Sequence, residues 1–226
     1  MIKFVNKIGG GEAMLNGVDL KYLHENFIDK FNFSKGDIEL IEKNAISKIL
    51  NKNELIYLKS DCYGYILVKN GSLRAYISSS TLKEITIFNI KTGEQCILCD
   101  SCFMSNFATD INLQVELNTE IILIPPFVFK KLKDKYIDLV NYILALVSKR
   151  FSSSVSLMEQ AIFLPLIDRI RNFLHQNEQN GIIKVTHEEL ANNIGSAREA
   201  VSRILKEMEN SGEITQSRGL IKLMQK

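Results

Sequence analysis

Residues 185–214 read VTHEELANNIGSAREAVSRILKEMENSGEI, and this stretch carries the signals that predict the fold of the last third of the chain. Thr186 is followed three positions later by Glu189, which is the capping-box pattern that opens a helix. Gly195 stands where that helix is expected to end, because glycine readily adopts the left-handed conformation of a helix C-cap. The stretch therefore predicts one helix, a tight turn and a second helix.

The second predicted helix has an apolar face and a polar face. Ser196 with Glu199 repeats the capping-box pattern at its start. Apolar residues at helical spacing predict its buried stripe: Val201, Ile204, Leu205 and Met208. A polar set is expected to project from the outer face of its first turns: Arg198, Glu199, Ser202 and Arg203.

A β-hairpin is expected after this helix. Gly212 stops the helix, and EITQSRGLIKLM turns near Arg218 and Gly219. Upstream, Pro165 suits the start of an amphipathic helix in LIDRIRNFLHQ, and NGIIKV supplies a turn and a short strand. This order predicts a winged helix-turn-helix, the arrangement that lays its second helix into the major groove of DNA.

The middle of the chain, residues 54–124, predicts strand after strand. In YGYILVKNGSLRAYI, two runs rich in β-formers flank Asn70 and Gly71, a pair that predicts a type I′ hairpin turn. KEITIFNI, QCILC and NLQVELNTEIILI continue the pattern, with Gly93 and Asn118 expected in turns. We expect an all-β unit, a small barrel or roll.

Pro125 and Pro126 end the strands, and a long helix is expected over about residues 133–158. One small β unit would not cover such a helix, so we expect it to pair with its copy in a homodimer. The alternative is a helix that lies along its own roll. The expected dimer contacts are Tyr136, Leu139, Val140, Ile143, Leu146 and Val147.

The stretch EELANNIGSAREAVSRILKEMENSGEI closely resembles the DNA-binding domain of the CRP/FNR superfamily of bacterial transcription regulators. The resemblance extends over residues 20–226. It implies an α+β fold with a β-roll sensor domain of the double-stranded β-helix or jelly-roll type in residues 1–130. A dimerisation helix and hinge would occupy residues 131–160, and the winged helix-turn-helix residues 161–226. The implied function is a transcription regulator that acts as a homodimer on an inverted-repeat operator in double-stranded DNA.

The family pattern R-E-x-x-x-R implies which residues read bases: Arg198, Glu199 and Arg203. Ser202 is the choice of FNR-like members, whereas Arg198 is the choice of CRP-like members. The chemistry agrees, because arginine can donate two parallel hydrogen bonds to guanine and a glutamate oxygen can accept one from cytosine. Serine can reach a base edge or a phosphate.

Ser196 and Thr186 complete the expected DNA-contacting set. The alternative interpretation is a solvated helix face, on which Arg203 is held by Glu199 or Glu207. The formal net charge of the chain is only +2, and the predicted winged domain has nine Lys or Arg against eight Asp or Glu. Any electrostatic contribution to DNA affinity is therefore expected to be local.

The sequence argues against a cyclic nucleotide as the effector. Cyclic-nucleotide-binding members hold the ribose with a Gly-Glu pair and the phosphate with an Arg-Ser pair, and our alignment places Ile97-Leu98 and Ile111-Asn112 there. Aliphatic side chains offer no acceptor to a ribose, and a phosphate would lack its arginine. We therefore expect a small-molecule effector other than cAMP, and RNA polymerase as a further partner.

Residues 96–102, CILCDSC, hold three of the four cysteines. With Cys62, the thiols of Cys96, Cys99 and Cys102 could form a metal cluster, which defines an alternative: a redox-sensing or iron–sulfur-sensing regulator. Strand alternation would point Cys96 and Cys99 to opposite faces, so packing inside the roll is favoured. No resident cofactor or metal is expected.

The composition, 46% hydrophobic and 24% charged over 226 residues, suits a two-domain soluble protein. The longest apolar stretch is interrupted by Asp138 and Asn141, and the N-terminus is too weakly apolar for a secretion signal, so a cytoplasmic location is predicted. The three histidines, His24, His175 and His187, lie on separate predicted elements. Since no P-loop or nucleophile elbow occurs either, an enzyme is not expected.

Overall fold

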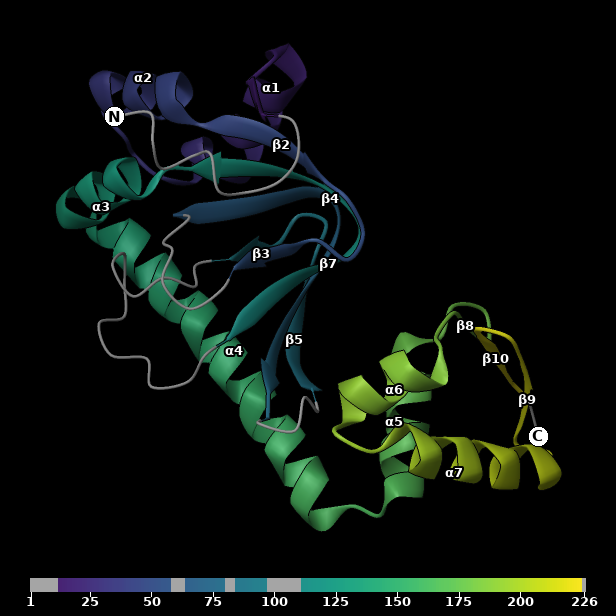
Figure 1. Cartoon of the computed structure of the whole chain (residues 1–226). Helices are drawn as coiled ribbons and strands as arrows, with labels where there is room; N and C mark the ends of the chain where they lie inside the picture. Colours follow the sequence, from purple (N-terminus) through teal and green to yellow (C-terminus); the bar gives the residue numbers. More distant parts are fainter. Residues whose placement is uncertain (1–11, 58–63, 80–83, 97–110, 225–226) are drawn as a thin grey trace. The chain divides into compact units, whose positions relative to one another are not determined.

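The computed structural model describes residues 12–57, 64–79, 84–96 and 111–224 (Figure 1). It confirms the mixed fold class, with an antiparallel sheet in the N-terminal part and a helix-turn-helix in the C-terminal part. Two compact units are distinguished, one of residues 1–77 and 88–150 and one of residues 78–87 and 151–226. The division falls inside the long helix α4 (Ile137–Phe163).

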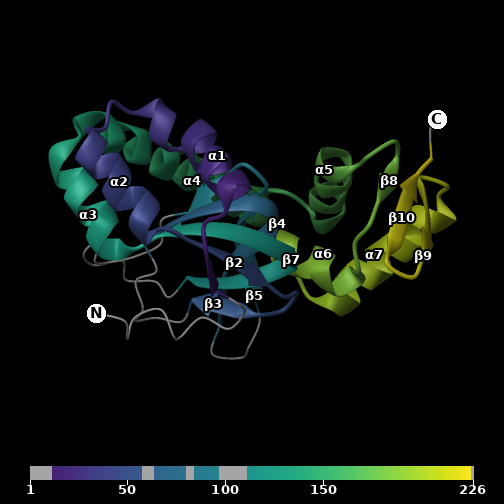
Figure 2. The same ribbon diagram turned by 90° about the horizontal axis from the view of Figure 1, so that it is seen from above.

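The sheet of the first unit has the strand order β1-β2-β7-β4-β5, with β3 beside β7 and β6 beside β4. Helices α1, α2 and α3 gather at one end of it (Figure 2). The strands are β1 (Glu12–Met14), β2 (Ile46–Leu50), β3 (Leu55–Tyr57), β4 (Tyr65–Ser78), β5 (Glu84–Lys91), β6 (Gln95–Cys96) and β7 (Asn112–Ile124).

The predicted hairpin at Asn70 and Gly71 is wrong. Strand β4 runs through both residues and pairs antiparallel with β7 from Tyr65 to Tyr76, with register shifts around Asn70. The Gly71 backbone, at φ 103°, approaches β7 so closely that a Cβ would lie 2.4 Å from Thr119 Oγ1. That hydroxyl also accepts a hydrogen bond from the Ser72 N–H at 3.0 Å. Pairing with β7 therefore overrides the local preference for a turn, and Asn118 likewise lies within β7.

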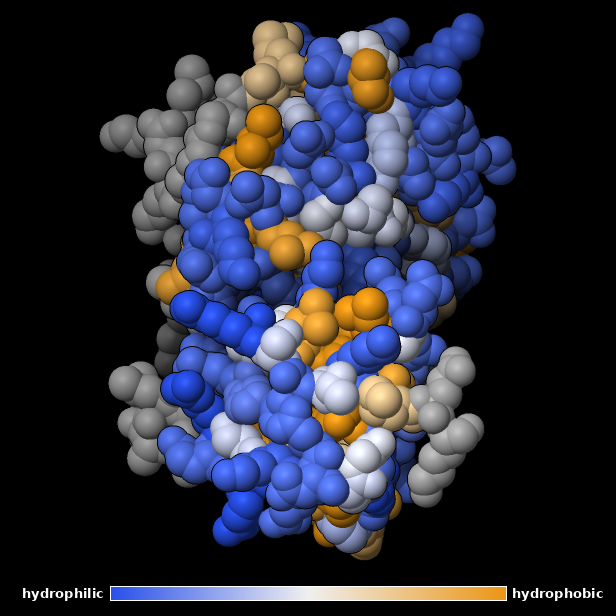
Figure 3. Space-filling model, turned by 90° about the vertical axis from the view of Figure 1, so that its right-hand side faces the viewer, coloured by the Kyte–Doolittle hydropathy of each residue, from blue (hydrophilic) through white to orange (hydrophobic). Residues whose placement is uncertain are grey.

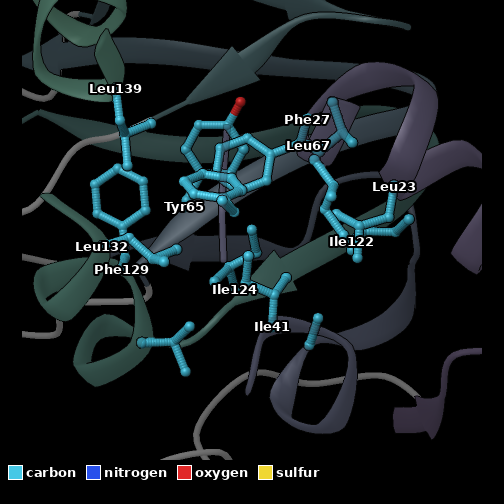
Figure 4. Close-up of a cluster of buried hydrophobic side chains, with 14 of the residues drawn as sticks. Leu23, Phe27, Ile41, Tyr65, Leu67, Ile122, Ile124, Phe129, Leu132 and Leu139 are labelled. Atoms are coloured by element: carbon cyan, nitrogen blue, oxygen red, sulfur yellow. The ribbon is translucent and has the colours of Figure 1, made fainter. Parts of the chain in front are cut away.

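An aromatic cluster joins the sheet to the N-terminal helices (Figure 4). The Phe27 ring centroid lies 4.6 Å from that of Tyr65, and Tyr65 stacks on Phe129 at 5.3 Å. Burying each such side chain contributes about 1.5–3 kcal/mol. The surrounding elements are α1 (Gly17–Asn26), the short 3-10 helix η2 (Ile28–Lys30), α2 (Lys35–Asn44) and α3 (Pro126–Lys135).

The helical stretch after the two prolines is broken at Tyr136, which ends α3 with φ −117° and ψ 105°. Beyond it, Leu139 and Ile143 of α4 are fully buried within the aromatic cluster of the same chain; Leu139 lies near Phe129 (Figure 4). Tyr136 and Val147 also pack against this cluster. Leu139 and Ile143 thus lie in the roll core of their own protomer, as in the alternative of a helix that lies along its own roll. The predicted set of dimer contacts stays a prediction.

A buried carboxylate fixes the break between α3 and α4. Asp37 Oδ2 accepts hydrogen bonds from Ser34 Oγ at 2.7 Å and Tyr136 Oη at 2.6 Å, and it also pairs with Lys135 Nζ. The ammonium group of Lys135 first, then the two hydroxyls, hold the pKa of Asp37 well below its usual range. Asp37 is 3% exposed, so these donors replace its hydration shell.

Replacing Asp37 with asparagine is expected to lower the free energy of unfolding by about 1.5–3 kcal/mol at pH 7, because charge-assisted hydrogen bonds are lost. A lowered folded-state pKa stabilises the fold above the unfolded-state pKa of about 3.9, and that stabilisation is lost as the pH falls. Urea unfolding of both proteins should therefore give a difference that shrinks below about pH 4. Asp134→Asn, an exposed change on α3, is the control, and an equal loss there would refute this role of Asp37.

The second unit contains α5 (Leu166–Asn177), α6 (His187–Ile194), α7 (Arg198–Asn210) and a small sheet of order β8-β10-β9. The strands are β8 (Ile182–Ile183), β9 (Ile214–Ser217) and β10 (Leu220–Leu223). Its own core joins the three helices to the sheet: Ile170, Leu174, Ile183, Val185, Leu190, Ala191, Ile194, Val201, Leu205, Met208, Ile214 and Ile221. The predicted winged helix-turn-helix is thus present.

In the part of the chain that the structure describes, no helix has the length and apolar character that crossing a bilayer requires. Hydrophilic residues cover most of the face shown in Figure 3, and the hydrophobic residues there form small groups.

Candidate DNA-binding site

Helix α6 begins as the sequence predicts. Thr186 is its N-cap: the Thr186 Oγ1 accepts a hydrogen bond from the Glu189 N–H at 3.1 Å, and the Glu189 carboxylate accepts one from the Thr186 N–H at 2.8 Å. Gly195 ends the helix in the left-handed conformation, at φ 65° and ψ 49°. Because this glycine turn is short, α7 follows directly after α6.

The start of α7 differs from the expectation. Ala197 is its N-cap, and no side chain caps the helix, so Ser196 and Glu199 do not form a capping box. The first turn instead follows from the closing turn of α6, where the Ser196 N–H donates to the Ala191 carbonyl oxygen at 2.9 Å. Glu199 is therefore free of any capping role, and its replacement is not expected to remove a helix cap.

The exposed face of α7 carries a cluster of three charged side chains. Arg198, Glu199 and Arg203 are exposed, while Val201, Leu205 and Met208 on the opposite face are buried. Within the described residues, none of the three charged side chains takes part in an ion pair or hydrogen bond. The alternative of a salt-bridged helix face, with Arg203 held by Glu199 or Glu207, therefore finds no support. These groups retain their full capacity to bind a ligand.

Ser202 is half-buried beside the exposed cluster and has a partner that the sequence analysis missed. Its Oγ lies 2.8 Å from His187 Nδ1, and His187 Nε2 lies 3.0 Å from Gln216 Oε1 on β9. Fifteen positions separate His187 from Ser202 in the sequence, so no local periodicity could have indicated this contact.

The wing is tied to the helices by an arginine. Arg171 on α5 donates two hydrogen bonds to the Glu213 carboxylate, from Nε at 2.9 Å and from Nη2 at 3.0 Å. Glu213 stands just before β9, and Gly219 at φ 72° turns β9 into β10 as predicted. A bidentate pair of this kind restrains the wing relative to α5.

Helix α4 has a second apolar stripe, outside the face that is buried in the roll. Four exposed residues repeat every seven positions: Ile137, Leu144, Phe151 and Met158. Val155 and Ile162, also exposed, lie four positions after Phe151 and Met158. We call these six residues the α4 seam. A heptad of exposed apolar residues is the pattern by which two helices pack side by side.

The roll is joined to α4 by polar contacts as well. Tyr142 Oη donates to Gln95 Oε1 at 2.7 Å. The Arg150 Nη1 donates to the Asn89 carbonyl oxygen at 3.1 Å, and its guanidinium lies 4.7 Å from the Phe88 ring centroid. These contacts connect α4 to the strand β5 and to β6 at once.

The positions aligned with the cyclic-nucleotide signature are described only in part. Ile111 is 8% exposed and Asn112 is the first residue of β7. Ile97 and Leu98 lie outside the described residues.

Among the cysteines, Cys96 is described, and Cys62, Cys99 and Cys102 lie outside the described residues. Cys96 is 4% exposed on β6, and burial raises the pKa of its thiol to about 12. A protonated, buried thiol packs as a small apolar side chain and is a poor nucleophile. No group of three or more His, Cys, Asp or Glu side chains within the described ranges could hold a metal ion.

Cys96 is therefore expected to resist alkylation by iodoacetamide at pH 8 in the folded protein and to react fully after unfolding in urea, because only the thiolate reacts. Peptide mass spectrometry after timed quenching measures the modification at each cysteine separately. Native labelling of Cys96 as fast as that of a free thiol would contradict the packing role and favour a redox sensor.

Residues 167–226 match the model of the Crp-like helix-turn-helix domain. A crystal structure described as a transcriptional regulator of the CRP/FNR family from Eubacterium rectale is 30% identical, with a TM-score of 0.81, and the match covers 89% of this chain and 95% of that one. None of the curated proteins is similar enough in sequence to count as a relative.

Two more distant structures share the fold. The c-di-GMP-responsive global regulator CLP of Xanthomonas campestris is 19% identical, with a TM-score of 0.73, over 85% of this chain and 100% of that one. FixK2 of Bradyrhizobium japonicum is 16% identical, with a TM-score of 0.66, over 80% of this chain and 93% of that one. Together with the winged helix-turn-helix and the exposed face of α7, the 30% identity over nearly the whole length shows that the chain belongs to the CRP/FNR family of transcriptional regulators.

Proposed function

We propose that this regulator binds an inverted-repeat operator as a homodimer and that it reads base pairs with α7 in the major groove. The observation that carries the proposal is the exposed cluster of Arg198, Glu199 and Arg203, whose charges have no partner within the described residues. Unpaired ionic groups on the outer face of the second helix are what direct base readout requires. Thr186 and Ser196 stand at the N-terminal ends of α6 and α7, where phosphates are favourably bound.

The α4 seam supports the homodimer. Its residues are exposed apolar side chains that repeat at heptad spacing along α4, from Ile137 to Ile162. Pairing with the same stripe of a second copy would remove this area from water. Two recognition helices related by a two-fold axis then require half-sites whose centres lie about 34 Å apart, one turn of DNA.

The proposed effector binds in or near the roll and is not cAMP. The contacts of Tyr142 with Gln95 and of Arg150 with Asn89 and Phe88 would transmit a shift of β5 and β6 to α4. Because α4 carries the seam, such a shift would alter how the two subunits pair. The regulated process is transcription at a promoter, with RNA polymerase as the proposed partner there.

Selection of binding sites from random DNA tests the proposal. The purified full-length protein should enrich a two-fold symmetric motif, and each half should contain a G·C element in line with the arginine and glutamate of α7. An enriched motif without two-fold symmetry would refute the dimeric operator. Absence of any enriched motif would refute sequence-specific binding, provided that light scattering shows a monodisperse protein.

A further inference from the structure

A relay of hydrogen bonds connects α7 to the wing. His187 Nδ1 lies 2.8 Å from Ser202 Oγ, and His187 Nε2 lies 3.0 Å from Gln216 Oε1. Gln216 in turn donates to the Glu209 carboxylate twice, from its side-chain Nε2 and from its backbone N–H, both at 3.0 Å. One end of the relay is therefore a carboxylate, and the other is a hydroxyl beside the exposed cluster of α7.

The carboxylate end fixes the direction of each bond. The side-chain amide of Gln216, followed by its backbone N–H, keeps the pKa of Glu209 below its usual range, so Glu209 is ionised and only accepts. The amide nitrogen of Gln216 must then face Glu209, which turns the amide oxygen toward His187. Because that oxygen also only accepts, Nε2 of His187 must carry a proton.

The other ring nitrogen is thereby an acceptor in the neutral histidine. Nδ1 has no proton in this tautomer, so the Ser202 hydroxyl must donate its hydrogen to Nδ1 across the 2.8 Å contact. The hydroxyl oxygen keeps its lone pairs but has no hydrogen left to offer. A free serine hydroxyl could rotate and act in either sense.

We propose that His187 is a positioning residue for DNA recognition, which holds the Ser202 hydroxyl so that it meets the DNA as a hydrogen-bond acceptor. This inference rests on the proposed function. In the major groove, an acceptor on the protein matches the amino groups of adenine and cytosine, and it is repelled by the oxygen acceptors of guanine and thymine. A freely rotating hydroxyl would accept any base. By fixing the Ser202 hydroxyl as an acceptor, His187 makes it favour adenine or cytosine over guanine or thymine.

The test uses the full-length protein and duplexes of the selected operator that differ only in the base pair contacted by Ser202. That base pair is the one at which Ser202→Ala loses its preference. In fluorescence anisotropy titrations at pH 8, the wild type should prefer adenine or cytosine over guanine or thymine about threefold to tenfold, the effect of one hydrogen bond. His187→Phe, which keeps a ring but has no ring nitrogen, should lose this preference. The double variant His187→Phe/Ser202→Ala should show no greater loss of preference than either single variant.

A second measurement leaves His187 in place. Gln216→Ala removes the acceptor that holds the proton on Nε2 of His187, so it should weaken the preference at this base pair. Adding Gln216→Ala to Ser202→Ala should change nothing more at that position. His175→Gln, a change of an exposed histidine at the end of α5, is the matched control and should keep the wild-type profile.

The outcomes separate this inference from the proposed function. A wild type without any sequence preference would refute the proposed function itself. A wild type that binds its operator specifically, while His187→Phe keeps the same preference at every base pair, would refute only the role of His187. If His187→Phe does not fold, Gln216→Ala still decides: a preference in that variant as large as in the wild type refutes the inference. So would Ser202→Ala weakening all duplexes alike, since Ser202 would then contact the backbone.

Discussion

Replacing Arg203 with alanine is expected to cost about 1–3 kcal/mol of operator affinity per subunit, or about 2–6 kcal/mol for the dimer, and to remove the preference for one guanine in each half-site. The reason is that Arg203 is exposed on α7 and has no partner within the described residues that would occupy its donors. Anisotropy titrations against the selected operator and single-base variants measure both effects.

Two control variants sharpen this prediction. Arg203→Lys keeps the charge but cannot donate two parallel hydrogen bonds, so it should bind nonspecific DNA like the wild type and still lose the guanine preference. Asn210→Ala changes an exposed residue in the last turn of the same helix and should have little effect. An intact guanine preference in both Arg203 variants would show that another residue reads that base pair.

The second large effect is expected at the α4 seam. Leu144→Glu and Phe151→Glu should each dissociate the dimer, because pairing would bury an unpaired carboxylate at a cost of about 3–5 kcal/mol. Both side chains are more than half exposed in the protomer, 52% and 69%, so the roll should remain folded. Without its partner a subunit holds a single half-site, and operator affinity should fall by orders of magnitude.

Light scattering and urea unfolding distinguish the role of the α4 seam from that of the α4 residues buried in the roll. Ile143→Glu places a charge in the roll core, where Ile143 is fully buried, so it should unfold the first unit and not merely dissociate the dimer. Ser156→Glu, exposed on α4 outside the seam, should leave both the dimer and its stability unchanged. Dimers that persist in both Leu144→Glu and Phe151→Glu would show that the seam is not the interface.

The C-terminal unit was predictable because its signals are local. The capping box of Thr186 and Glu189 and the left-handed Gly195 and Gly219 each act over a few residues, so the sequence alone carries them. Ser196 shows the limit of such reasoning, because its pattern suits a cap but Ala197 takes that position. The turn from α6 sets where α7 begins, and the pattern does not encode this.

Two features could not be predicted from local sequence, because they depend on contacts between distant parts of the chain. Asn70 and Gly71 favour a hairpin, yet both lie in one long strand, because β7 pairs with it from Tyr65 to Tyr76 across the register shifts around Asn70. In α4 the apolar residues form two faces, and their spacing alone does not say which face the roll covers. The partnership of His187 with Ser202 is of the same kind, since only tertiary structure brings the two elements together.

The pairing of β4 with β7 delays the folding of the roll during synthesis. Tyr65 pairs with Ile124, so β4 is synthesised well before its partner strand β7. At a synthesis rate of about 5–20 residues per second, the delay lasts several seconds, during which an apolar strand has a bare edge. In the winged unit, β9 and β10 pair within a few residues of each other, so only the short strand β8 waits for its partner β10. We therefore expect chaperones to bind the nascent chain chiefly while the roll is incomplete.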